Sequence, residues 1–154
     1  MSKARGLANH SLYMARLLLS AWAETQSAAV TPIHAIDAAF APAVRLHLLD
    51  AYGWFLLTSM RATQLPDGPP HCVAELADRA PGIARPAEVS ECQYLENTGW
   101  LAQLQAPLPK GLARRGLGMS LAIESAYPDI SMYRNWARHV EDLFARMSDA
   151  IDEC

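Results

Sequence analysis

Apolar residues recur every three to four positions along most of this chain, which is the spacing of one face of an α-helix. The first such stripe predicts a helix over about residues 7–28, with its charged residues off the apolar face. The second predicts a helix that starts after Thr31, which can cap it, has Pro32 in its first turn, and ends near Met60. Pro42 lies inside this segment without a backbone donor, so the helix either kinks there or a new helix starts there.

The middle of the chain, about residues 65–90, is rich in Pro and Gly and gives the weakest helical pattern. The stretch "CVAELADRA" predicts one short helical piece. Pro86 can open a further helix, because a proline fits the first turn. The stretch "ENTGWLAQLQ" is typical of a helix end that is followed at once by another helix start.

The last third begins as a loop over residues 107–118. The stretch "MSLAIESAY" then alternates apolar and polar residues, which predicts a short extended strap. A final helix starts near Asp129 or Ser131 and runs to about Asp152, with a continuous apolar stripe.

These elements predict an all-α fold, a single-domain antiparallel helical bundle of about four main helices that spans residues 1–154. The composition agrees, since 51% of the residues are hydrophobic and 19% are charged, as in a globular protein. The net charge of -3 does not favour a protein that coats nucleic acid.

The sequence shows no targeting or membrane-spanning pattern. No apolar stretch stands behind the charged first residues, so we expect no secretory signal. The richest apolar run, "LHLLDAYGWFLLTSM", is interrupted by Asp50 and is too short to span a bilayer. We therefore expect a cytoplasmic protein. Cys72, Cys92 and Cys154 form no CxxC pair, so we expect neither a disulfide framework nor a zinc site.

A possible catalytic motif lies in the final helix, where Arg134, Asn135 and His139 spell Arg-Asn-x-x-x-His. This resembles the Arg-x(4–6)-His motif of the HEPN superfamily of four-helix ribonucleases. The resemblance implies metal-independent RNA cleavage, in which His139 handles a proton of the 2′-hydroxyl and Arg134 stabilises the phosphorane charge. On a regular helix, however, side chains five residues apart diverge by about 140°. The alternative is that both residues merely flank the apolar stripe.

A possible metal site comes from two pairs in the second helix, His34 with Asp37 and His47 with Asp50. Each pair has the spacing that places both groups on one helical face. The two pairs are separated by about 20 Å on a continuous helix, and the Glu-x-x-His motif of carboxylate bundles does not occur. Capping or solvent-facing roles are the alternative, and we expect no metal and no cofactor.

The order of segments resembles an uncharacterised family of small bacterial all-helical proteins, known only as a domain of unknown function. The resemblance rests on "SLYMARLLLSAWAE", "RLHLLDAYGWFLL", "GWLAQLQ" and "LAIES", in that order. It implies an all-α fold and no activity. The Pro- and Gly-rich middle departs from the family. Because no titratable groups have the spacing of an assembled site, we predict a non-enzymatic binding or interaction module, with an unknown protein partner or a second copy as a homodimer. The HEPN-like ribonuclease is the alternative.

Overall fold

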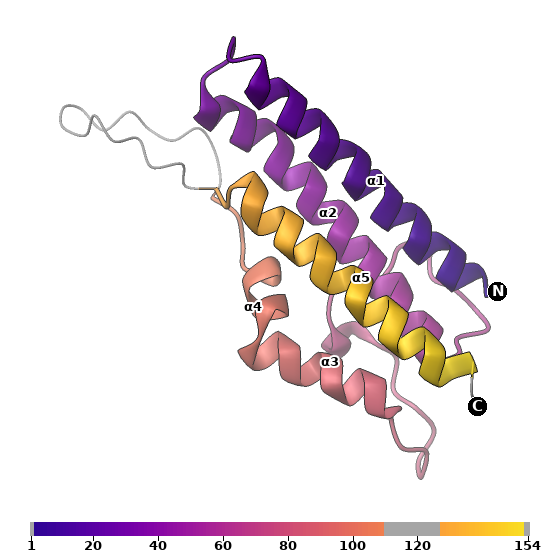
Figure 1. Ribbon diagram of the computed structural model, residues 1–154. Helices are drawn as coiled ribbons and strands as arrows, with labels where there is room; N and C mark the ends of the chain where they lie inside the picture. Colours follow the sequence, from indigo (N-terminus) through magenta and orange to yellow (C-terminus); the bar gives the residue numbers. More distant parts are fainter. Residues whose placement is uncertain (1, 110–126, 153–154) are drawn as a thin grey trace.

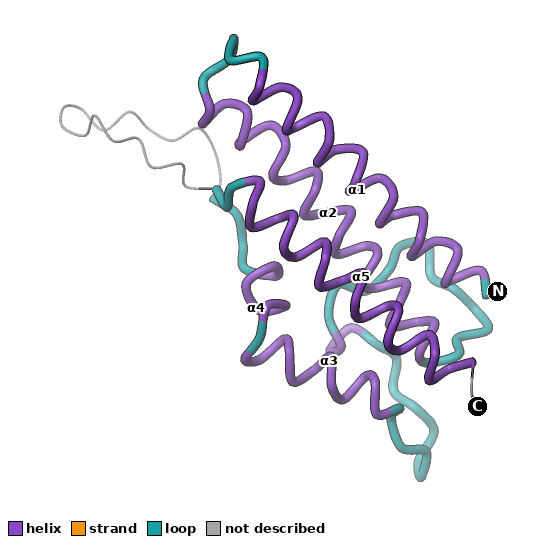
Figure 2. The backbone as a smooth tube through the Cα atoms, in the orientation of Figure 1, coloured by secondary structure: helices purple, strands orange, loops and turns teal. Residues whose placement is uncertain are grey.

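The computed structural model describes residues 2–109 and 127–152, except for the side chain of Ile151. In these two ranges the chain forms helices and loops and no strand (Figure 2). The prediction of an all-α helical bundle is confirmed. The elements are α1 (Lys3–Ser27), α2 (Ile33–Ser59), the 3-10 helix η1 (Val73–Glu75), α3 (Ala87–Thr98), α4 (Trp100–Gln105) and α5 (Ile130–Asp152).

The three long helices form the body of the molecule, with α1 antiparallel to both α2 and α5 (Figure 1). Helices α2 and α5 run in the same direction, because the chain crosses back along the bundle between them. Contacts of the shorter helices place them beside α2 and α5. Tyr52 of α2 donates to Glu96 of α3, and Arg146 of α5 pairs with Glu91 of α3.

Aromatic rings join the long helices at both ends. Near the α1–α2 turn, the Trp22 ring lies 5.9 Å from Phe40 of α2 and 5.7 Å from Tyr133 of α5. At the other end, the rings of Phe55 and Phe144 are stacked 4.6 Å apart. All but the half-buried Phe40 are buried. Since full burial of one such side chain contributes roughly 1.5–3 kcal/mol, these rings are a large part of the core energy.

The long helices are found where the sequence patterns predict them, and α1 begins a turn earlier. Helix α1 begins at Lys3 because the Ser2 hydroxyl accepts a hydrogen bond from the Arg5 amide (3.2 Å). Helix α2 continues through Pro42, so the alternative in which a new helix starts there is wrong. The Pro42 side chain is exposed. Helix α5 begins as predicted, and Asp129 caps it by accepting from the Met132 amide (2.9 Å).

Of the other predicted elements, one differs from its prediction and one lies almost wholly outside the described residues. The stretch "CVAELADRA" forms only one 3-10 turn, η1, and then continues without regular structure. Pro81 and Gly82 close the stretch directly, and a short helix has little stability of its own in water. The predicted strap "MSLAIESAY" lies outside the described residues except for Tyr127, and so does most of the loop 107–118.

Residues 60–86, which we call the crossing segment, lead from α2 to α3 along one side of α2. This segment packs directly on Gly53 of α2. A Cβ placed on Gly53 would overlap the carbonyl oxygen of Pro70 and lie 2.9 Å from Cβ of Pro69. Gly53 is two residues from Phe55, which faces α5, so the two positions are about 200° apart on the helix. The crossing segment therefore covers α2 on the side opposite α5.

We expect Gly53→Ala to lower the free energy of unfolding by about 1–3 kcal/mol, because the added methyl group collides with backbone that cannot rotate away. Gly6→Ala is the matched control, since nothing lies within 4 Å of its Cβ position in α1. There the better helix propensity of Ala should raise stability by up to about 1 kcal/mol. Urea unfolding of both variants measures the difference. Equal free energies of unfolding for Gly53→Ala and Gly6→Ala would show that the crossing segment does not pack closely on Gly53.

Candidate functional site

The first two thirds of α2 expose no charged side chain of Asp, Glu, Lys or Arg that lacks a partner inside the molecule. Between Ile33 and Leu49 the only Asp, Glu, Lys or Arg residues are Asp37 and Arg45. Asp37 is buried and accepts a hydrogen bond from the Trp22 indole (3.2 Å). Arg45 donates to the carbonyl oxygens at the end of α4. Both charged groups are therefore used inside the molecule, and none points outward from this part of α2.

The uncovered side of α2 lies on the same side of the helix as Gly53. Leu46 and Ala39 precede Gly53 by seven and fourteen residues, about two and four turns, so all three share one face. The crossing segment covers that face at Gly53 but not further toward the start of α2. Leu46 is 50% exposed and Ala39 is exposed. This end of α2 is thus an open apolar surface.

Helix α1 extends this surface on the same side. Arg16 of α1 pairs with Glu141 of α5 (2.6 Å), and Met14 and Leu18 are each two residues away, about 160° around the helix. They therefore face away from α5, as the open part of α2 does. Leu17, next to them, is 48% exposed. We call this surface the rear face; its residues are Met14, Leu17, Leu18, Ala21, Ala35, Ala39, Pro42, Ala43 and Leu46.

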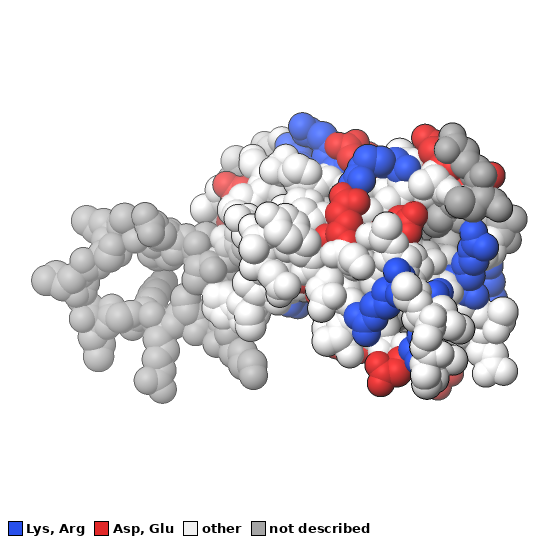
Figure 3. Space-filling view, turned by 90° about the horizontal axis from the view of Figure 1, so that it is seen from below, with Lys and Arg blue, Asp and Glu red and all other residues white. Residues whose placement is uncertain are grey.

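The charged side chains elsewhere are mixed in sign. In the view of Figure 3, Lys and Arg side chains lie among Asp and Glu side chains rather than in a separate patch. Several of these form ion pairs that join elements, such as Arg146 with Glu91 and Arg16 with Glu141. This face does not show the one-sided basic stripe that binds a phosphate backbone.

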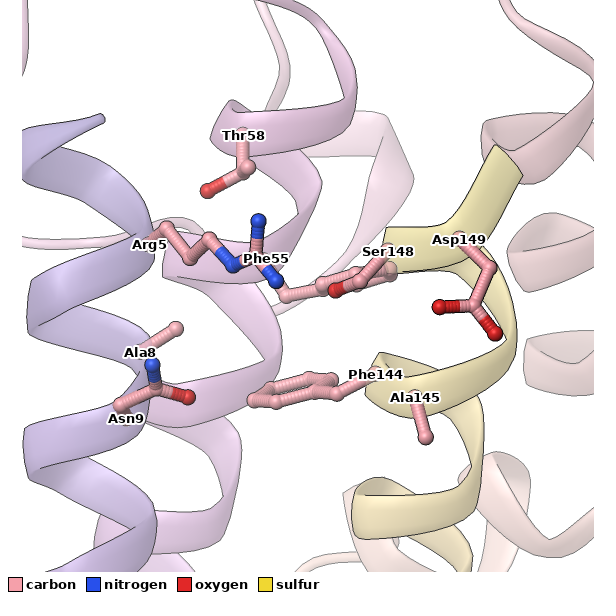
Figure 4. Close-up of a pocket in the computed structure, with 9 residues that line it drawn as sticks. All are labelled: Arg5, Ala8, Asn9, Phe55, Thr58, Phe144, Ala145, Ser148 and Asp149. Carbon is pink, nitrogen blue, oxygen red and sulfur yellow. The ribbon is translucent and has the colours of Figure 1, made fainter. Parts of the chain in front are cut away.

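A small cavity of about 300 Å³ lies between α1, α2 and α5 near the C-terminal end of α5 (Figure 4). Its floor is the stacked pair Phe55 and Phe144, and its rim carries Arg5 and Asp149. The Arg5 guanidinium is already engaged with Asp152 (3.4 Å). Because the floor rings are buried against each other, the cavity offers a ligand little apolar surface, and its volume is at the low end for ligand sites.

The ribonuclease motif is spread over two flanks of α5. The His139 ring stacks on Trp100 of α4, with centroids 5.3 Å apart. Arg134 and Asn135 are exposed, and Arg134 is two turns from Glu141, which faces α1. The uninterrupted helix α5 thus directs His139 toward α4 and Arg134 toward the α1 side. One chain does not bring the pair together, and RNA cleavage stays an untested prediction.

The metal candidates of α2 lie in four different surroundings. His34 is exposed at the first turn, and Asp37 is buried beside Trp22. His47 is half-buried, and Asp50 contacts the His71 ring (2.7 Å), a partner from the crossing segment. No group of three or more His, Cys, Asp or Glu side chains could hold an ion within the described ranges. Cys72 and Cys92 are free thiols, and Cys154 is outside the described residues.

The structure adds a polar junction that sequence patterns miss. One carboxylate oxygen of Glu96 accepts from the Tyr52 hydroxyl (2.7 Å) and from the Val73 amide (2.9 Å), which joins α2, α3 and η1. Burial raises the pKa of Tyr52 above its ordinary value, since the phenolate has no access to water. Gln105 of α4 adds a hydrogen bond to the His71 carbonyl (2.8 Å). These contacts hold the crossing segment in place and do not surround an open space.

Comparison with family models, curated proteins and solved structures finds no match. The resemblance to a family of small bacterial helical proteins therefore stays a prediction. In the described part of the chain, no helix combines the length and apolar character needed to cross a bilayer.

We expect stability to fall as the pH rises above about 9. Burial raises the pKa of Cys92 from 9.0 to about 12 and that of Tyr133 from 10.0 to about 12. The unfolded chain releases these protons at the ordinary values while the folded chain holds them. Their contribution is therefore complete below pH 9 and is lost toward pH 12, at up to about 1.4 kcal/mol per pH unit per group. Urea unfolding across this range measures the slope.

Cys92→Ala should flatten that slope, because one of the retained protons is gone. Tyr94→Phe is the control, since Tyr94 is 67% exposed on the same helix, and it should leave the slope unchanged. Parallel pH profiles for Cys92→Ala and the parent protein would contradict the assignment.

His139→Ala separates the two roles given to this histidine. The stacking on Trp100 predicts a loss of about 0.5–1.5 kcal/mol in the free energy of unfolding. Arg134→Ala, at an exposed position, should change stability by less than about 0.5 kcal/mol. The ribonuclease hypothesis instead requires that the parent protein cut RNA and that both variants lose the cleavage. Unchanged cleavage in His139→Ala would end that hypothesis.

Proposed function

We propose that this protein is a cytoplasmic, non-enzymatic interaction module and that its partner at the rear face is a second copy of the same chain. The observation that carries the proposal is an apolar surface on two adjacent helices that no Lys, Arg, Asp or Glu residue interrupts. Contiguous exposed apolar surface of this kind marks interaction sites in water-soluble domains.

The lack of charge favours a second copy over another partner. In a twofold dimer each face meets itself, so a charged residue near the axis would approach its own copy and repel it. The rear face avoids this, because Asp37 and Arg45 are both directed into the molecule. A partner recognised by charge would find no counter-charge on this surface.

The shape of the rear face fits helix packing. Ala35, Ala39 and Ala43 form a row of small side chains on α2, with Leu46 and Leu17 larger at the margins. Small residues let helices approach to the lower end of the usual 8–10 Å spacing. Two α1–α2 hairpins placed face to face would then make a four-helix interface.

The size of the surface predicts a weak dimer. The rear face extends about 17 Å along α2, from Ala35 to Leu46, and two adjacent helices are about 18 Å wide, which gives about 300 Å² on each copy. The sum, about 600 Å², is below the limit of about 1,000 Å² for stable specific interfaces and is in the range of weak, transient contacts. We therefore expect a dissociation constant in the micromolar range.

The proposal of a non-enzymatic role is supported by the contacts of the polar side chains. Asp50 with His71, and Glu96 with Tyr52, join separate elements instead of lining a cavity. The free thiols Cys72 and Cys92 fit a reducing compartment such as the cytoplasm.

We expect Leu17→Glu and Leu46→Glu each to weaken dimerisation at least about tenfold, because each places two like charges in the interface. Both residues are about half exposed, so the monomer fold should tolerate the change. Sedimentation equilibrium at micromolar concentrations measures the association.

Tyr94→Glu is the control, because Tyr94 is a more exposed aromatic residue on α3, away from the rear face. It should leave association unchanged. A parent protein that stays monomeric to millimolar concentration would refute the dimer, and equal weakening by Tyr94→Glu would place the interface elsewhere.

A further inference from the structure

A second and larger cavity lies under the crossing segment, with a volume of about 700 Å³. Its apolar wall comes from the end of α2 and from the segment itself: Leu57, Met60, Leu65, Pro66, Pro69 and Leu76. The volume is within the usual range for sites that bind small molecules. Leu57, Met60 and Leu65 are only half-buried, so apolar surface faces this space.

The cavity is held open by fixed backbone. Pro70 rests on Gly53, and the prolines in the wall have a fixed φ. Arg79 joins the far side of the segment to its start, directly after α2, by donating to the Met60 carbonyl (3.3 Å), and it also donates to the Ala84 carbonyl (2.8 Å). A site formed in advance loses less conformational entropy when a ligand binds.

The polar side chains of the lining are two carboxylates, one amide (Gln64) and one guanidinium. Glu75 and Asp78 belong to it, and neither forms an ion pair within residues 2–109 and 127–152. One oxygen of Glu75 accepts from the His71 amide (2.7 Å), which leaves the other for a ligand. The single cation of the lining, Arg79, is engaged with two backbone carbonyls. The lining thus has an excess of negative charge.

We propose that this cavity binds a small apolar ammonium ion, that is, a molecule with a hydrocarbon body and one protonated amine. The body would contact the leucine, methionine and proline side chains, and the amine would lie between Glu75 and Asp78. A carboxylate ligand would have to approach two like charges and displace Arg79 from its carbonyl partners.

Octylammonium and octanoate are the probes, because they share one hydrocarbon chain and differ in the sign of the head group. Calorimetric titration below micelle concentrations should show saturable one-to-one binding of octylammonium and at least about tenfold weaker binding of octanoate. Butylammonium should bind far more weakly, since each buried CH₂ group multiplies affinity by up to about fourfold.

The double variant Glu75→Gln with Asp78→Asn should lower octylammonium affinity by about threefold to fivefold for each carboxylate and remove the preference over octanoate. The amide oxygen of the introduced glutamine can still accept from the His71 amide, so the backbone contact is kept. Asp67→Asn is the control for the effect of one lost carboxylate charge, since it removes that charge from an exposed position of the segment outside the lining. It should leave affinity unchanged.

Three outcomes would overturn the proposal. They are no saturable binding of octylammonium, octanoate binding as tight as octylammonium binding, or an equal loss in Asp67→Asn and in the double variant. Thermal unfolding of each variant without probe confirms that the site is folded. None of the substituted residues belongs to the rear face, so the result does not depend on whether the chain dimerises.

Discussion

The contact between Gly53 and Pro70 determines how the remaining surface of α2 is used. Helices α2 and α5 are parallel, so the chain must return along the bundle between them, and the first part of this connection packs on α2 at Gly53. Backbone can lie directly on a helix only where the helix has no side chain, and Gly53 provides that place. Seven residues earlier the same face carries Leu46, which is too large for such a contact. The crossing segment therefore covers one end of α2 and leaves the other end open.

Polar contacts hold the crossing segment in place, because the segment itself buries few apolar side chains. Its prolines and short side chains supply little core, yet its backbone must be hydrogen-bonded when it leaves water. Glu96 satisfies the Val73 amide, Gln105 satisfies the His71 carbonyl, and Asp50 contacts the His71 ring. Each partner comes from a different helix, so removing one loosens the segment without unfolding the three long helices. Beyond the contact at Gly53, the same segment leaves an unfilled space beside Leu57, near the end of α2.

The sequence predicts what depends on neighbours along the chain and misses what depends on distant residues. The stripes of α1, α2 and α5 are local, and their helices are found where predicted, with α1 extended by the Ser2 cap. Spacing pairs Asp50 with His47, three residues before it, whereas its structural partner is His71, far along the chain. No pattern marks Gly53 beyond a glycine within an apolar helix, which is itself a signal of close backbone approach. The open face of α2 is predictable in part, since its apolar residues surround the helix on all sides.

A helix that is apolar all round is ordinarily buried all round. Helix α2 satisfies this on three sides, through α1, α5 and the short helices, and on the fourth side through the crossing segment at one end only. The uncovered end presents Ala39 and Leu46, which suit contact with side chains rather than with backbone. The two ends of this face of α2 therefore suit different contacts: backbone at Gly53, and side chains at Ala39 and Leu46. The chain provides the first itself, by a glycine and a proline-rich loop, and the second fits the helices of another molecule of the same shape.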